Sequence, residues 1–234
     1  MNETLIVFHA DCGESLREHR SVGHDNVFDP ALSVPLILRL PSRLPEGLRV
    51  DGLVRNVDIF PTVLEVVGLE DVLPLSGESL ASLISAAEEG TPPPIERETY
   101  METYMETYMG AHRPFAVGVV LPDGTRAEIG IVLKGVRTNR WKYVVREPAL
   151  FFGEDKLPSV SDRVLDLVRT RQFFDLEVDP RESQNVIDAH PDVARVFERK
   201  LATYTAREAA KPAADTVELD ASEKARLRAL GYLE

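Results

Sequence analysis

The sequence is poor in cysteine and basic residues, and it has no long hydrophobic segment. Its single cysteine, Cys12, excludes a disulfide within the chain and is compatible with a reducing compartment. We expect no membrane span, because no run of 18 or more apolar residues is present. The first residues lack the basic and apolar regions of a signal peptide, so nothing in this chain assigns a compartment.

Acidic residues outnumber basic ones, 39 to 27, which gives the 234-residue chain a net charge of −12. This balance argues against nucleic acid or an anionic membrane surface as the main partner. It does not exclude a small anionic substrate, because a bound cation can reverse the local field. The length suits one large domain, or one domain with a small companion.

The first 95 residues predict an α/β arrangement. Apolar runs at residues 4–8 and 34–40 are typical of buried strands, the first of which we take to be parallel. Residues 57–67 have helical spacing and stop at Gly68, a natural helix end. A second short helix is expected at residues 79–87. Strand, loop, strand and helix in this order indicate an α/β fold.

The later residues predict a small antiparallel sheet with a packed helix. Pro122-Asp123-Gly124 lies between β-rich runs and favours a hairpin turn. Further strands are expected at residues 137–145 and 173–176, with an exposed insertion at 148–165 between them. The helix at residues 191–206 would place one set of apolar side chains on a common face. These are Val193, Val196, Phe197, Leu201 and Tyr204.

These patterns divide the chain into residues 1–95, residues 96–206 and a tail, 207–234, with a short helix at 222–230. The first part would have strands without neighbours, so we expect low solubility or stability of the isolated chain. Residues 98–109 read ETYM three times. A period of four suits a stripe along a helix or one face of a strand, and a duplication that lengthens a loop is the third alternative.

Six segments follow one another along the chain: TLIVFHADCGESLREHRSVGHDNVFDPALSVPLIL, VDGLVRNVDIFPTVLEVVGL, GESLASLI, GVRTNRWKYV, FFDLEVDPRESQNV and LRALGYL. Taken in this order, they resemble the C-terminal part of sulfatases, which belong to the alkaline-phosphatase-like superfamily. The resemblance covers nearly the whole chain. The resemblance implies a fold in which the first part belongs to a larger mixed sheet with flanking helices. It also implies a metal-dependent hydrolase that acts on small sulfate esters.

Sulfatases use a formylglycine nucleophile, made from cysteine in a Cys-x-Pro-Ser-Arg or Cys-x-Ala-x-Arg segment of their N-terminal half. That segment is absent here, and Cys12 is followed by Gly-Glu-Ser-Leu. The chain therefore has no nucleophile of its own. We expect it to be a fragment whose missing partner is the N-terminal half.

Three residues stand at positions that the resemblance connects with catalysis. Asp11 matches a metal-binding aspartate, and a carboxylate that follows a parallel strand is suited to Mg²⁺ or Ca²⁺. Cys12 occupies the place of a second ligand, usually His or Asn. A thiolate is too soft for Mg²⁺ or Ca²⁺, so the site prefers another metal or is weakened or lost. His24 matches the His or Lys that contacts the sulfate group or leaving oxygen.

Three alternatives to an active hydrolase of sulfate esters remain open. The chain could be a non-catalytic remnant or interaction module, or it could be one half of a split enzyme. A hydrolase of phosphate or phosphonate esters from the same superfamily would use the same metal frame.

Overall fold

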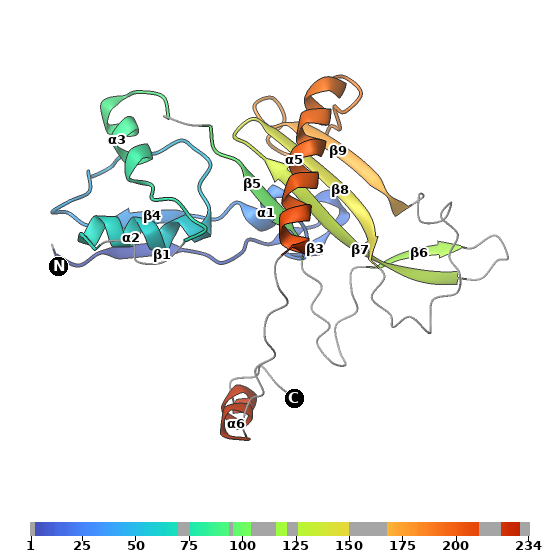
Figure 1. The fold of residues 1–234 in the computed structure, drawn as a ribbon, viewed down its shortest axis with the longest axis horizontal. Coiled ribbons are helices and arrows are strands. Elements are labelled where there is room, and N and C mark those ends of the chain that lie inside the picture. The colour runs from blue at the N-terminus through green and yellow to red at the C-terminus, as the bar shows by residue number, and fades with distance from the viewer. Residues whose placement is uncertain are drawn as a thin grey trace. The chain divides into compact units, whose positions relative to one another are not determined.

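The computed structural model describes residues 3–69, 75–93, 96–103, 116–120, 126–149, 168–210 and 221–229 (Figure 1). The chain forms two compact units, residues 1–202 and 203–234. The described part of the first unit holds two sheets of two strands, one larger sheet of five strands and several helices, which confirms the expected α/β character. In the second unit, α6 (Ala221–Ala229) confirms the short terminal helix.

The first strand, β1 (Ile6–His9), pairs with β4 (Leu36–Arg39), and Phe8 lies opposite Ile37. Both strands were predicted, but the parallel direction expected for residues 4–8 is wrong, because β1 and β4 run antiparallel. Parallel neighbours are usually joined by a long crossover helix. The connection between β1 and β4 instead holds four short elements: β2 (Ser15–Leu16), η1 (Glu18–Arg20), β3 (Val22–Gly23) and α1 (Asp29–Leu32).

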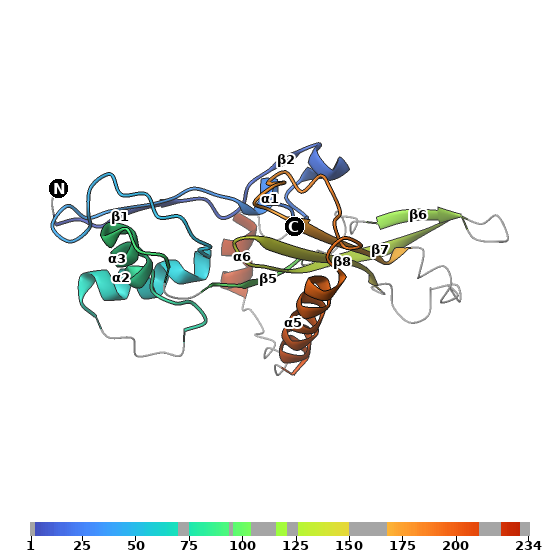
Figure 2. The same ribbon diagram turned by 90° about the horizontal axis from the view of Figure 1, so that it is seen from above.

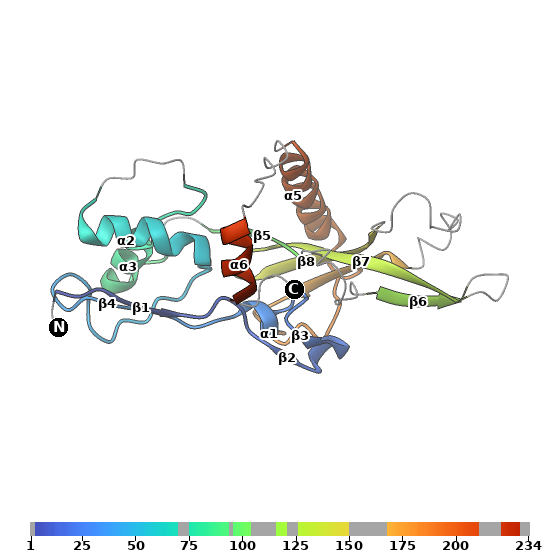
Figure 3. The ribbon, with the colours of Figure 1, turned by 90° about the horizontal axis from the view of Figure 1, so that it is seen from below.

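Two helices follow β4 and lie on the same side of the β1–β4 pair (Figure 3). The predicted helix begins as η2 (Asn56–Asp58) and continues as α2 (Ile59–Val67). Gly68 ends it with φ 81°, a left-handed conformation that favours glycine. The second predicted helix is α3 (Ala81–Glu89). Among the described helices, none has the length and apolar character needed to cross a membrane.

The larger sheet is antiparallel, as predicted, with the strand order β5-β7-β8-β9 and β6 also paired to β7. The prediction of a single strand over residues 137–145 is wrong, because one strand ends at Arg137 and the next begins at Trp141. Thr138, Asn139 and Arg140 form a turn there, which the Thr138 N–H closes on the Trp141 carbonyl at 2.8 Å. Asn side chains favour such turns. The strands are β5 (Thr99–Glu102), β6 (Ala116–Val120), β7 (Arg126–Arg137), β8 (Trp141–Ala149) and β9 (Thr170–Asp175).

Several predicted loop features fall partly outside the described residues. β6 and β7 pair with Val120 opposite Arg126, which confirms a hairpin, while its turn at 121–125 is not described. Most of the insertion expected at 148–165 is likewise not described. For the ETYM repeat, β5 confirms the strand alternative over Thr99–Glu102, and residues 104–115 lie outside the description.

The larger sheet has one layer on each face (Figure 2). On one face lies α5 (Pro191–Ala209), whose Phe197 ring meets Phe173 at 5.4 Å. The buried side chains of α5 in the first unit are Ala194, Phe197 and Leu201; Val196 is exposed, so its place on the buried face was predicted wrongly. The other face meets the segment around α1. The core there comprises Val27, Phe28, Met101, Leu133, Val144, Phe174 and Leu176.

Two buried groups of charges cross the boundary predicted at residue 95. Asp29 of α1 binds Arg137 and Lys142 of the larger sheet. Asp58 of η2 binds Arg97, which precedes β5, at 3.0 Å. The division into residues 1–95, 96–206 and 207–234 stays a prediction, but these contacts tie the first two parts together.

Candidate functional site

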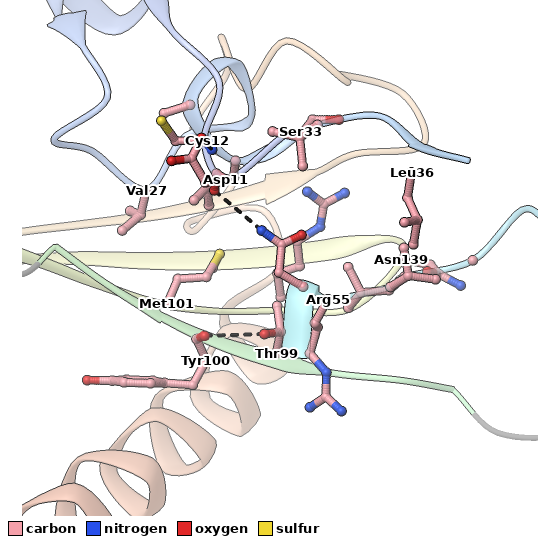
Figure 4. A pocket seen from close by; sticks show the side chains of 18 of the residues that line it. Asp11, Cys12, Val27, Ser33, Leu36, Arg55, Thr99, Tyr100, Met101 and Asn139 are labelled. Atoms are coloured by element: carbon pink, nitrogen blue, oxygen red, sulfur yellow. Dashed lines mark hydrogen bonds between the residues drawn. The ribbon is translucent and has the colours of Figure 1, made fainter. Parts of the chain in front are cut away.

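A pocket of about 840 Å³ lies between the loops that follow β1 and the edge of the larger sheet (Figure 4). One wall carries all three residues proposed from the sequence, Asp11, Cys12 and His24. The other wall comes from β5 and from the β7–β8 turn. The structure therefore brings the predicted site residues together, while their catalytic and metal-binding roles stay predictions.

Asp11 follows β1 by two residues and is held by its own backbone. The N–H of Cys12 donates to Oδ1 of Asp11 at 2.9 Å, and this bond lowers the pKa of the carboxyl below its ordinary value. The Asn56 amide donates to the carbonyls of Ala10 and Asp11 at 3.3 and 3.4 Å. The loop after β1 is thus tied to the start of η2, and Asp11 presents an ionised carboxylate to the pocket.

Gly13 fixes the course of the same loop. Its N–H donates to the Ala31 carbonyl at 2.8 Å, and a Cβ at this position would lie 2.2 Å from the carbonyl oxygen of Pro30. Because that distance is too short for any side chain, glycine is required. The close approach packs the loop that carries Asp11 and Cys12 against α1.

Cys12 is exposed, and its thiol has a raised pKa. Desolvation is the main cause, and the negative charges of Asp11 and Glu14 add to it. A raised pKa keeps the thiol protonated at neutral pH. Sulfur is also a soft ligand, so Cys12 is poorly suited to Mg²⁺ or Ca²⁺.

His24 follows β3, and a hydrogen bond to Glu14 holds its side chain. Nδ1 of His24 lies 3.1 Å from Oε2 of Glu14, and this hydrogen bond is the main cause of the raised pKa of the histidine. Charges of Asp25, Glu14 and Asp11 act in the same direction, against desolvation. A protonated imidazole at this wall can donate to an anionic group.

The other histidines near this region do not line the pocket. His19 stacks on Phe28 with ring centroids 3.9 Å apart, and its Nε2 lies 3.6 Å from Glu182. His9 is exposed and lies 3.2 Å from the Ala10 carbonyl. His19 therefore has a packing role, and neither histidine was among the site residues predicted from the sequence.

A divalent cation, expected for a sulfatase, does not fit the residues of this chain by themselves. Within the described residues, no group of three His, Cys, Asp or Glu side chains could hold a metal ion. At the pocket, Asp11 offers a hard oxygen ligand, whereas the neighbouring position is a protonated thiol. The chain thus contributes one suitable side chain, Asp11, to such a site.

The second wall of the pocket was not predicted from the sequence. It carries Thr99, Met101 and Glu102 of β5, together with Arg137 and Asn139 at the β7–β8 turn. A signal was available, since the polar run Arg137-Thr138-Asn139-Arg140 interrupts two apolar strands. Strand ends followed by polar residues are common positions for binding groups, but the sequence could not place this one beside Asp11.

Comparisons with known proteins find similarity to sulfatases. Residues 17–117 match the family model described as N-sulphoglucosamine sulphohydrolase, C-terminal. Arylsulfatase K of Homo sapiens is 27% identical over 201 residues, which cover 86% of this chain. The chain spans about a third of the length of the curated relatives that it matches, since the matched part is 31% of the human protein.

Solved structures show the same fold. A protein in complex with its substrate D-glucosamine-2-N,6-O-disulfate superposes with a TM-score of 0.59 at 21% identity, covering 91% of this chain and 36% of that one. The phosphonate monoester hydrolase of Agrobacterium radiobacter gives 0.56 at 23% identity, covering 87% and 35%. The chain is thus similar in sequence to the C-terminal part of sulfatases, and it shares the fold of these solved structures.

Proposed function

We propose that this chain supplies the substrate-facing C-terminal part of a hydrolase of sulfate esters. The observation that carries the proposal is the convergence of Asp11 and His24 on one pocket, whose other wall is built by the larger sheet. The family model and the relatives described above support this class of reaction. A relative acts on a disulfated glucosamine, which supports a small sulfated molecule as the substrate.

In this proposal the two residues act on different parts of the substrate. His24, protonated through its hydrogen bond to Glu14, donates to the sulfate group or to the leaving oxygen, where negative charge develops. Asp11 is the cation ligand that this chain contributes, with Mg²⁺ or Ca²⁺ as the expected ion. The nucleophile comes from a formylglycine-bearing N-terminal part, as one chain with this one or as a separate half.

The test is turnover of 4-nitrophenyl sulfate. The 234-residue chain alone should show none, and the chain combined with a nucleophile-bearing sulfatase N-terminal part should be active. In the active combination, His24→Ala should lower kcat about 100-fold or more. His9→Ala is the matched control, because this exposed histidine does not line the pocket. Metal-dependent turnover by the chain alone, or inactivity of every combination, would contradict the proposal.

A non-catalytic interaction module is the second candidate function, and Cys12 is the observation that favours it. A soft sulfur ligand beside Asp11 would weaken a site for Mg²⁺ or Ca²⁺. Cys12→His should therefore raise the affinity for Mg²⁺ or Ca²⁺, measured by calorimetry on the active combination. An unchanged affinity would rule out that Cys12 weakens the cation site. In a separate assay, turnover of phenyl phosphonate in place of 4-nitrophenyl sulfate would favour a phosphonate hydrolase.

A further inference from the structure

Two cationic side chains lie next to each other on the face of the larger sheet that meets α1. Arg137 of β7 is paired in register with Lys142 of β8. Both side chains donate to Oδ1 of Asp29. Nη1 of Arg137 lies 2.5 Å from this oxygen, and Nζ of Lys142 lies 2.8 Å from it. Lys142 is fully buried and also contacts Glu182. The buried lysine thus has two carboxylate partners within the protein.

Arg137 differs from Lys142 because it reaches the pocket. It lines the cavity that holds Asp11 and His24, and 19% of its side chain is exposed. Among the described residues, its acceptors are Asp29 at Nη1 and the Thr138 carbonyl, 3.4 Å from Nε. A guanidinium has five N–H donors. The two donors on Nη2 therefore have no acceptor in the described part of the chain.

Asp29 holds this guanidinium in a fixed position. The N–H of Asp29 donates to Oε2 of Glu182 at 2.8 Å, which anchors the start of α1. Burial alone would raise the pKa of Asp29, but the charges of Lys142 and Arg137 keep it below its ordinary value. Asp29 therefore stays ionised at neutral pH. An arginine that is already oriented loses little freedom when it binds an anion.

We propose that Arg137 is a specificity-determining residue, which binds a second anionic group on the leaving-group part of the sulfate ester. That group is a carboxylate or a further sulfate, the planar or multidentate anions that a guanidinium recognises. The inference rests on the proposed function, since it assumes that the sulfate itself lies at the wall of Asp11 and His24. The amide of Asn139, on the same wall as Arg137, is placed to bind neutral polar groups of the same molecule.

Binding to the 234-residue chain tests this inference without turnover, because the chain has no formylglycine segment. The probes are 3-carboxyphenyl sulfate, benzene-1,3-disulfate ester and the neutral counterpart 3-carbamoylphenyl sulfate, titrated calorimetrically in Mg²⁺ buffer. We expect at least one anionic probe to bind roughly tenfold more tightly than the carbamoyl probe. The better of the two anionic probes identifies the second group as carboxylate or sulfate.

Arg137→Gln should abolish the preference for the anionic probes. Arg137→Lys should reduce it several-fold, because lysine lacks the bidentate fork, and it serves if the Gln variant does not fold. Arg140→Gln is the matched control: this neighbouring arginine pairs with Asp175 at 2.8 Å and does not line the pocket. It should keep the full preference.

The inference is overturned if the Gln and Lys variants keep the preference, if the wild-type chain binds all three probes equally, or if it binds none. Turnover of 4-nitrophenyl sulfate by the combined enzyme is measured separately and needs no second anion. An active enzyme with unselective binding would thus remove the role of Arg137 and leave the proposed function standing.

Discussion

The hydrogen bond to Glu14 favours the protonated form of His24, the residue proposed to contact the sulfate. Because this bond raises the pKa of His24 in the folded chain, the pair contributes stability at pH values below the ordinary pKa of histidine. The contribution is lost as the pH rises through the folded pKa. The pair is more than half exposed, so its role concerns charge at the site more than stability.

Glu14→Gln should therefore shift the titration of His24 to lower pH, because the amide removes the charge and weakens the hydrogen bond. The measurement is an NMR titration of the His24 ring protons. His9, which lies outside the pocket, gives the internal control in the same spectra. A His24 titration that does not move would show that Glu14 does not set its charge.

For single residues, the sequence predicted that Asp11, Cys12 and His24 would lie close together. It did not predict that Arg137 would line the same pocket. Asp11, Cys12 and His24 lie within 14 positions of one another, so a short loop could bring them together. Arg137 lies more than 100 residues later, and its position beside Asp29 depends on the register of β7 with β5 and β8. Single-residue patterns carry no information about such a register.

Among the elements, the start of η2 depends on one buried carboxylate. Asp58 is fully buried. Its carboxylate pairs with Nη2 of Arg55 at 2.8 Å and with Nη2 of Arg97 at 3.0 Å, and it accepts a hydrogen bond from the Glu78 N–H at 3.0 Å. Burial alone would raise its pKa, but the hydrogen bonds from Arg55 and Glu78 hold it below the ordinary value. Its contribution to stability is present above the unfolded pKa and is lost as the pH falls through the folded pKa.

Asp58→Ala should lower the free energy of unfolding by about 3–5 kcal/mol, because it removes a buried carboxylate that Arg55 and Arg97 share. Urea unfolding at pH 7 measures the change. Asp51→Asn is the control, since the exposed pair of Asp51 with Arg49 should contribute less than about 1 kcal/mol. Equal effects of the two substitutions would exclude a structural role for the burial of Asp58.

The β1–β4 pair exposes apolar side chains, as expected for strands without their neighbours. Phe8 and Ile37 face each other across the pair, and each is 58% exposed. Exposed apolar patches of this kind mark surfaces that another segment covers, or else they promote association. The two lie on the same face of the pair and can be changed without touching the pocket.

The double variant Phe8→Lys, Ile37→Lys should reduce self-association of the isolated chain and leave its melting temperature within a few degrees of the wild type. Static light scattering across a concentration series measures the first effect, and circular dichroism measures the second. If self-association persists unchanged, the surface that mediates it lies elsewhere on the chain.

Element types were predictable where local patterns were strong, and strand direction was not. Gly68 ended a helix, and the apolar spacing of residues 191–206 marked α5, because both signals are local. The antiparallel direction of β1 and β4 depends on how residues 10–35 fold back. The short polar turn at Thr138–Arg140 was concealed by the β-forming residues on both sides, Val136 and Trp141.

On the scale of the whole first unit, Asp29 joins the segment around α1 to the larger sheet. It binds Arg137 and Lys142 on neighbouring strands and, through its N–H, Glu182. Contacts of this kind between the two predicted parts favour a single cooperative unit. Separate melting of residues 1–95 and 96–206 would instead mark them as independent domains.

The chain carries a reporter in each part, because it has one cysteine and one tryptophan. A fluorophore on Cys12 and the emission of Trp141 should give coincident midpoints in urea. Asp29→Asn should lower both midpoints together, by a loss of about 3–5 kcal/mol, because Lys142 remains buried with one partner fewer. Two separated midpoints in the wild-type chain would support the boundary predicted at residue 95.

The two walls of the pocket come from stretches of chain that are far apart, residues 11–56 and 99–139. The strands of the second stretch all belong to the larger sheet, so a graft could replace β5 and the β7–β8 turn as a cassette while Asp11, Glu14 and His24 stay in place. Under the proposed function, libraries confined to that cassette would vary which alcohol is accepted and preserve the groups proposed to face the sulfate. Such a separation gives the scaffold a practical starting point for redirecting its selectivity in the laboratory.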